Sequence, residues 1–234
     1  MLKMKIKKFN LFSVVLILSC NKMSAQVPVF EEPRHKVVLL NDYIRLIDVH
    51  IPPHDTTLYH RHSTASAIVF LTRNTTGSQP MGGNPSVGQA VPGNTFFAGY
   101  GDKPISHRVW NQDTSVYHVM DIEILKHPDA ISCEAITNSS LQLKWEEKPA
   151  RMYSIRLNQH DHVDIAPGKC GHLLVVISGS VNYTPDASAS FPQVQTTRHN
   201  PLHAADFLWF DPGAHIAFNN AGKDYADCVL LEIR

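Results

Sequence analysis

The stretch VYHVMDIEI, residues 116–124, shows most clearly which kind of fold this chain adopts. Its residues fall into two alternating sets: Val116, His118, Met120, Ile122 and Ile124, and between them Tyr117, Val119, Asp121 and Glu123. Successive side chains of a β-strand point to opposite faces, so this period of two predicts a strand.

The same kind of pattern recurs through the rest of the chain. Residues 67–71 form a short apolar run, and alternation of period two returns in residues 141–145 and 153–157. Clusters of Gly, Pro, Asn and Asp separate these runs, and no helical periodicity extends beyond about three turns. The chain is therefore predicted to be all-β. Residues 26–34 are expected to form an irregular lead-in, and residues 75–94 a long surface loop.

The composition limits the classes of protein to which the chain can belong. Its 234 residues suffice for one large β domain or two small ones. Lys and Arg total 21, as do Asp and Glu, so no net charge favours nucleic acid or a membrane surface as a partner. With 43% hydrophobic and 18% charged residues, the chain can bury a sizeable core, and long disordered regions are not expected.

Residues 1–25 have the features of a signal peptide. Four lysines near the start precede the apolar run of residues 11–18, which is too short to span a bilayer. Ile17-Leu18-Ser19-Cys20 resembles the lipobox of bacterial lipoproteins, in which Cys20 becomes the lipidated N-terminus; alternatively, cleavage follows Ala25. Either way the protein is expected to be extracytoplasmic, in the periplasm or lipid-anchored to the cell envelope. It would touch the membrane only through the lipid at Cys20.

Three cysteines follow the signal peptide: Cys133, Cys170 and Cys228. The expected compartment permits disulfides, so at most one pair forms and one thiol is left. Cys170 and Cys228 lie in the same half of the chain, but the sequence does not show which two cysteines meet.

The chain contains a degenerate internal repeat. Each half has a proline-containing turn, an apolar strand, a histidine followed four residues later by asparagine, and a final strand. The histidine–asparagine pairs are His107 with Asn111 and His215 with Asn219. His107 lies 17 residues before Ile124, and His215 lies 18 residues before Ile233. We therefore predict two equivalent small barrels in tandem, joined near residues 126–139.

His60-Arg61-His62 is the clearest sign of chemistry in the chain. On a strand, His60 and His62 point to the same face, and His107 can supply a third imidazole from a neighbouring strand. Three protein ligands that leave an open position are typical of a catalytic metal site, and neutral imidazoles suit transition metals. The alternative is that these histidines are hydrogen-bonded members of the core. Candidate cavity neighbours are Tyr59, Ser66 and Phe70.

The remaining histidines give weaker signals. His160-Asp161-His162 is a second His-x-His, which we interpret as a polar strand edge; the alternative is a second metal site with His172 and His215. The sequence identifies no partner for His50 or His118.

Taken together, these residues resemble the cupin superfamily. Residues 53–62 fit the first cupin motif up to its pair of histidines, although His54 stands where glycine is usual. Residues 105–111 fit the end of the second motif, and Gly101 and Pro104 match its earlier positions loosely. Four residues after His62 stands Ser66 rather than Glu, and no Asp or Glu lies nearby. The carboxylate ligand of the family is therefore missing.

The second half resembles the family less closely. Residues 211–219 are similar to the second motif with shortened spacing, whereas residues 167–172 run into the next strand without a His-x-His. The resemblance covers about residues 36–233 and implies a bicupin with two tandem jelly-roll barrels. Residues 36–126 would form the N-terminal barrel with the metal motif, and residues 139–234 a degenerate C-terminal barrel.

The resemblance also implies a class of function. His60, His62 and His107 would hold a divalent transition metal (Fe, Mn, Zn, Cu or Ni) in a metal-binding protein of the cell envelope. Cupins include dioxygenases, isomerases and lyases, and the fold does not choose among them. The alternative is a non-catalytic protein that binds a metal or small ligand. The expected partner is a small molecule and not nucleic acid, and a homodimer is a further expectation.

Overall fold

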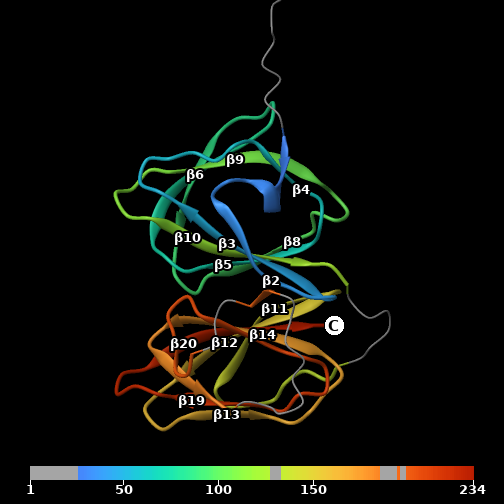
Figure 1. The fold of residues 1–234 in the computed structure, drawn as a ribbon, viewed down its shortest axis with the longest axis vertical. Coiled ribbons are helices and arrows are strands. Elements are labelled where there is room, and N and C mark those ends of the chain that lie inside the picture. Colours follow the sequence, from blue (N-terminus) through green and yellow to red (C-terminus); the bar gives the residue numbers. More distant parts are fainter. Residues whose placement is uncertain (1–25, 127–132, 185–193, 196–198) are drawn as a thin grey trace, which may run out of the picture.

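A computed structural model of the chain describes residues 26–126, 133–184, 194–195 and 199–234 (Figure 1). The predicted signal peptide, with Cys20, lies outside the described residues. Apart from the short 3-10 helix η1 (Val29–Glu31), the regular structure of the described residues is β, as predicted. Within that part of the chain, no helix has the length and apolar character needed to cross a membrane.

The first half of the chain folds into a barrel of two sheets, which forms the upper body in Figure 1. One sheet has the order β1-β4-β9-β6-β7, and the other has the order β16-β2-β3-β10-β5-β8. The strands are β1 (Val27–Pro28), β2 (His35–Leu40), β3 (Ile44–Ile51), β4 (His60–His62), β5 (Ser66–Phe70), β6 (Asn74–Pro80), β7 (Ser86–Ala90), β8 (Thr95–Ala98), β9 (Ile105–Asn111) and β10 (Tyr117–Ile124).

The second half forms an equivalent barrel, the lower body in Figure 1. Its sheets have the orders β11-β12-β20-β14-β18 and β13-β19-β15-β17. The strands are β11 (Leu141–Glu147), β12 (Ala150–Leu157), β13 (His162–Ile165), β14 (Gly171–Ser178), β15 (Ser180–Tyr183), β17 (Leu202–His203), β18 (Phe207–Phe210), β19 (Ile216–Asn220) and β20 (Ala226–Ile233). The two predicted barrels are therefore present. β16 (Val194–Gln195) belongs by sequence to this half but pairs with β2 of the first barrel.

The prediction of a surface loop at residues 75–94 was wrong. β6 and β7 form an antiparallel hairpin there, with Thr76 opposite Gly88, and β6 also pairs with β9. Gly82 supplies a positive φ of 73° at the turn, which glycine adopts without steric cost. Small polar residues suit this hairpin because β7 is an edge strand whose side chains are largely exposed.

The two barrels share one hydrophobic core. In β10, the side chains of Tyr117, Val119 and Asp121 point into the first barrel, whereas Met120 and Ile122 point out of it. This outer face packs against buried residues of the second barrel such as Leu173 and Leu231. Tyr43 of the first barrel stacks on Trp209 of the second, with ring centroids 5.7 Å apart. The barrels therefore meet through buried apolar surface rather than through a linker alone.

Cys133 and Cys170 form a disulfide, and Cys228 is a buried free thiol. The bridge ties the segment that enters the second barrel to the start of β14. One pair and one remaining thiol agree with the odd number of cysteines.

Gly171 is expected to be required by the packing of Trp209. A Cβ atom at residue 171 would lie 2.5 Å from Trp209 Cη2, and the Trp209 ring is buried and held by Tyr43. Gly171→Ala should therefore reduce the free energy of unfolding by about 1–3 kcal/mol, as overpacked core positions do. Gly168→Ala is the control, because nothing lies within 4 Å of its Cβ position. Chemical denaturation followed by tryptophan fluorescence measures both; equal stability of the two variants would contradict this account.

Candidate metal centre

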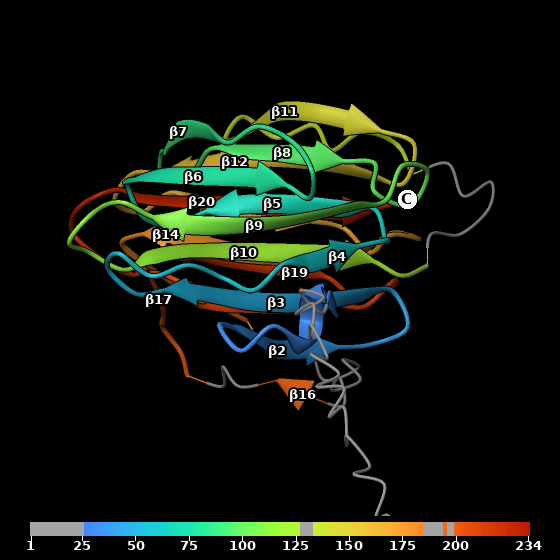
Figure 2. The ribbon, with the colours of Figure 1, turned by 90° about the horizontal axis from the view of Figure 1, so that it is seen from above.

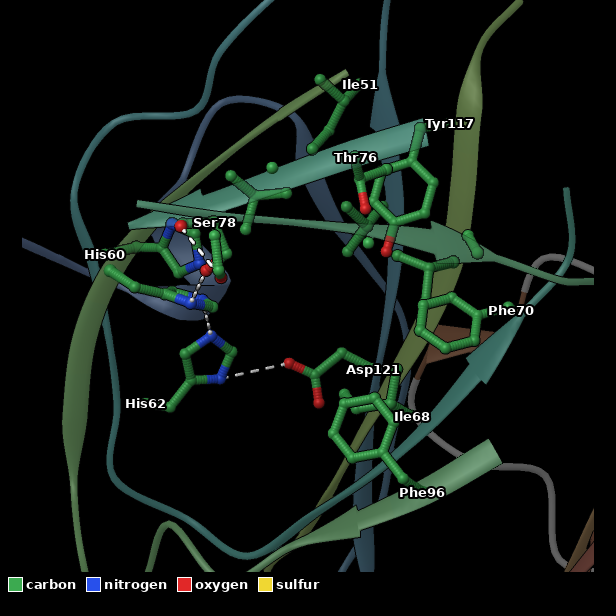
Figure 3. A pocket seen from close by; sticks show the side chains of 18 of the residues that line it. Ile51, His60, His62, Ile68, Phe70, Thr76, Ser78, Phe96, Tyr117 and Asp121 are labelled. Atoms are coloured by element: carbon green, nitrogen blue, oxygen red, sulfur yellow. Dashed lines mark hydrogen bonds and ion pairs between the residues drawn. The ribbon is translucent and has the colours of Figure 1, made fainter. Parts of the chain in front are cut away.

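Two neighbouring strands bring the three predicted histidines together. β4 places His60 and His62 on the buried face of the barrel wall and leaves Arg61 exposed, as period-two alternation requires. β9 runs antiparallel to β4, with His107 directly opposite His60. All three imidazoles therefore line the interior of the first barrel, and Figure 3 shows those of His60 and His62.

The spacing of the three imidazoles fits a shared metal ion. One ligand nitrogen from each ring can be chosen so that all three lie within 4.8 Å of one another. His62 Nε2 and His107 Nε2 are 3.1 Å apart. Two nitrogens bound to one ion at about 2.0–2.1 Å lie about 2.9–3.4 Å apart for bond angles between square and tetrahedral. The donor set thus suits a divalent transition metal without rearrangement of the strands.

The other ring nitrogen of each histidine faces a group that can fix its orientation. His60 Nδ1 is 3.0 Å from the Leu58 carbonyl oxygen, and His107 Nδ1 is 3.1 Å from Ser78 Oγ. His62 Nδ1 faces Asp121 Oδ2 across 3.4 Å (Figure 3). Metal-bound histidines are held in this way, with the second nitrogen directed at a carbonyl or carboxylate. Each Nε2 is then left to face the shared centre.

Burial keeps these imidazoles uncharged near neutral pH. It lowers their pKa from the ordinary value of 6.5 to about 3 for His60, about 2 for His62 and about 4 for His107. The charge of neighbouring imidazoles adds to the effect: His107 acts on both His60 and His62, and His35 acts on His107. Only a neutral imidazole offers its lone pair to a metal, so the site is prepared for one at neutral pH.

The sequence has no Asp or Glu close to His62, and we expected none near the site. The structure corrects this expectation, because folding places a carboxylate beside His62. Asp121 lies on β10, between Ile47 of β3 and Ile68 of β5, and its side chain is buried. Burial, with the negative charge of Glu123 added, raises the pKa of Asp121 to about 7. Its position beside His62 Nδ1 makes it a positioning residue for that imidazole. It does not occupy the place of the family's Glu, where Ser66 stands.

The sequence also missed His35. His35 is the first residue of β2 and directly follows the lead-in segment, whose strand β1 pairs with β4, with Val27 opposite His60. The His35 ring packs edge-on against the His60 ring, with centroids 4.8 Å apart, and His35 Nδ1 lies 2.7 Å from the Val29 carbonyl oxygen. The predicted irregular lead-in therefore forms part of the wall around the site.

The three histidines open into a cavity of about 500 Å³. Aromatic and aliphatic side chains line it opposite the histidines, among them Phe70, Phe96 and Tyr117 (Figure 3). Of the predicted neighbours, Phe70 lines the cavity, whereas Tyr59 and Ser66 do not belong to its lining in the described residues. Val87 and Phe96 line it and are also exposed, so they mark its mouth. A small molecule can therefore reach the open side of the histidine centre.

The second barrel has lost the site, and its predicted alignment was wrong by one residue. Asn111 Nδ2 donates to the Ile51 and Ser115 carbonyl oxygens, and Asn220, not Asn219, makes the corresponding bonds to Leu157 and Asp224. This register places Ile216 where His107 stands in the first barrel. Ile216 is paired with Ile165, just as His107 is paired with His60. The same register places Leu230 at the position of Asp121.

The alternative second site in the C-terminal barrel does not assemble. Among the described residues, no metal-binding group includes the histidines at positions 160, 162, 172 or 215. His172 Nε2 faces buried Glu232 at 3.4 Å, and His215 Nε2 faces Asp164 at 3.0 Å. His162 is exposed on β13, as a polar strand edge would be.

Comparisons with known proteins support the fold. No family model matches the chain, and no curated protein matches its sequence. Several solved structures match its shape. AerE from Microcystis aeruginosa is 10% identical, with a TM-score of 0.58 over 87% of this chain and 98% of its own. The bacterial pirin YhhW from Escherichia coli, solved in complex with nickel(II), is 14% identical, with a TM-score of 0.55 over 84% of each chain.

An oxalate decarboxylase from Lactobacillus farciminis, solved as a formate complex, is also similar. It is 12% identical, with a TM-score of 0.53 over 83% of this chain and 78% of its own. At these identities the likeness shows the fold alone. The chain has the two-barrel cupin fold that its sequence resemblance predicts.

The lowered histidine pKa values predict how the metal-free protein responds to acid. Between pH 6.5 and about 4, unfolded histidines bind protons that native His60, His62 and His107 do not, so stability should fall as the pH falls. Asp121 has the opposite effect on stability. Between pH 3.8 and about 7, its carboxyl group binds a proton in the native protein but not in the unfolded chain, so protonation of Asp121 stabilises the fold as the pH falls. Asp121→Asn should therefore steepen the loss.

Thermal unfolding of chelator-treated protein across this pH range measures the effect. His62→Gln should make the melting temperature depend less on pH, whereas the exposed control His162→Gln should leave the dependence unchanged. A melting temperature that is constant from pH 6.5 to 4, or that rises on acidification, would contradict the assignment of three buried neutral imidazoles.

Proposed function

We propose that this cupin-fold chain is a metal-dependent enzyme acting on a small, largely apolar molecule. The observation that carries the proposal is the convergence of His60, His62 and His107 on one point at the wall of a substrate-sized cavity. A purely structural metal site is closed by its protein ligands, whereas three ligands beside open space leave a position for an exchangeable group. The nickel(II) of the similar pirin structure supports metal binding by this fold.

The lining of the cavity supports a ligand that is apolar away from the metal. None of the described residues around the cavity is Lys or Arg, and its one carboxyl group, Asp121, is buried near His62. An anionic group could pair with the dipositive ion at the histidines, but elsewhere in the cavity it would find no protein cation, and burying an unpaired charge is costly. The rings of Phe70, Phe96 and Tyr117 offer apolar faces to a flat or branched apolar molecule.

The three histidines would hold the metal, and the chain's other residues would control the site around it. A dipositive ion on three neutral ligands supplies Lewis-acid polarisation or acidification of a ligand oxygen. Asp121, through its contact with His62 Nδ1, keeps that imidazole in position and provides a carboxyl group that exchanges a proton near neutral pH. Ser78 and the Leu58 carbonyl hold the other two rings. The apolar wall excludes bulk water.

Replacing the histidines should remove the metal without unfolding the protein. Wild-type protein is expected to carry a transition ion in the interior site, and His60→Ala/His62→Ala protein to lose one equivalent while it remains folded. Elemental mass spectrometry with circular dichroism measures both properties, and the exposed His162→Ala variant is the control. An unchanged metal content in the double variant would show that these residues do not form the centre.

The charge preference of the cavity can be measured with simple probes. Metal-free protein at pH 7.5 should bind phenol at least about tenfold more tightly than benzoate, because the cavity has no cation to offset a buried carboxylate. At that pH Asp121 is also largely ionised and repels benzoate. Calorimetric titration with the two probes, which are similar in size, gives the ratio. Equal or tighter binding of benzoate would contradict a protein lining that offers an anion no partner.

A further inference from the structure

A second cluster of metal-binding side chains lies on the outer face of the first barrel. In β3, Ile47 and Val49 belong to the barrel interior, so Asp48 and His50 lie on the opposite face. In β10, His118 lies on that same outer face. β3 and β10 are adjacent antiparallel strands (Figure 2), with His118 directly opposite His50 and Met120 opposite Asp48. We call Asp48, His50 and His118 the outer triad.

The outer triad is separate from the interior histidines. The sheet itself stands between them, because Val119 and Asp121 on β10 face the cavity while His118 faces outward. Farther along the outer face, Leu46 and Met120 are buried in the core between the barrels. The outer triad therefore lies where this apolar face gives way to polar residues.

The donor atoms of the outer triad lie close together. Asp48 Oδ1 lies 2.6 Å from His118 Nε2, and Asp48 Oδ2 lies 3.6 Å from His50 Nδ1, so each ring has a nitrogen near the one carboxylate. The two imidazole rings are stacked with centroids 3.9 Å apart. One donor atom from each residue lies within 4.8 Å of the others. The three residues lie on adjacent strands, so the sheet, rather than a loop, holds their donor atoms in place.

The surroundings leave room for an ion with further ligands from solvent. The His50 side chain is 49% exposed, which keeps part of any coordination sphere open to water. Two imidazole nitrogens and one carboxylate oxygen form a ligand set that suits zinc, copper(II) and nickel(II). Lys36 on β2 lies opposite Asp48, and its positive charge opposes a cation here.

We propose that the outer triad is a second transition-metal site, which binds a divalent ion such as Zn²⁺ independently of the interior centre. The donors come from two strands of one sheet, so the site exists without a partner molecule. This assignment does not depend on the proposed enzymatic function.

The test is a calorimetric titration of the chelator-treated full-length protein with Zn²⁺. The unchanged protein should bind two ions per chain. His60→Ala/His62→Ala protein should retain the outer ion, and His50→Ala/His118→Ala protein should retain the interior ion. The matched control, His162→Ala/His203→Ala, removes two exposed histidines elsewhere and should still bind two.

Two conservative variants separate a metal site from a simple ion pair. Asp48→Asn keeps the size of the side chain but removes its charge, and it should weaken the outer site by about tenfold or more. Lys36→Gln removes the opposing cation and should strengthen it. Two ions retained by His50→Ala/His118→Ala protein would overturn the outer site. Two ions retained by His60→Ala/His62→Ala protein would instead overturn the interior centre and leave the outer site standing.

Discussion

The alternation of side chains along β10 is the constraint on which the rest of the molecule depends. This strand lies at the centre of the sheet that separates the cavity from the second barrel. Val119 and Asp121 complete the cavity wall, while Met120 and Ile122 complete the core between the barrels. A shift of one residue would exchange these two sets and place a carboxylate in the apolar core. Register in this strand therefore fixes the position of Asp121 relative to His62 and that of His118 relative to His50.

A comparison of the two barrels separates the residues that recur in both from the residues that form the histidine centre. An ion pair with a buried carboxylate recurs at equivalent places: Arg45 with Glu123 in the first barrel, and Arg151 with Glu232 in the second. At the positions of His60, His107 and Asp121, however, the second barrel has Ile165, Ile216 and Leu230. Ile216 and Leu230 belong to a continuous apolar core. One barrel thus keeps a cavity with polar ligands, and the other fills the same space with aliphatic side chains.

The sequence predicted what depends on local periodicity and short spacing. The alternating strands and the shared face of His60 and His62 follow from side-chain direction in strands, and the two barrels follow from the internal repeat. Asp121 was missed because it is far from the histidines in the sequence and comes close to them only when the chain folds. A carboxylate among the apolar residues of a central strand is nevertheless a signal in the sequence, because a buried carboxylate usually has a polar partner. His215 was aligned with His107 from spacing alone, and a difference of one residue reverses the face. Residues 75–94 looked like a loop because small polar residues also suit an exposed edge strand.

The shared core between the barrels has a consequence for how the chain is made. The N-terminal half leaves the ribosome first, with the outer face of β3, β5 and β10 exposed until β12, β14 and β20 have been synthesised. The edge of its sheet is also completed late, because β16 pairs with β2 across more than half of the chain. Such distant contacts slow folding, and exposed apolar faces favour aggregation. The apolar face of the nascent first barrel is therefore prone to aggregation until the second half has been made, and the two halves are expected to reach their final structure as one cooperative unit.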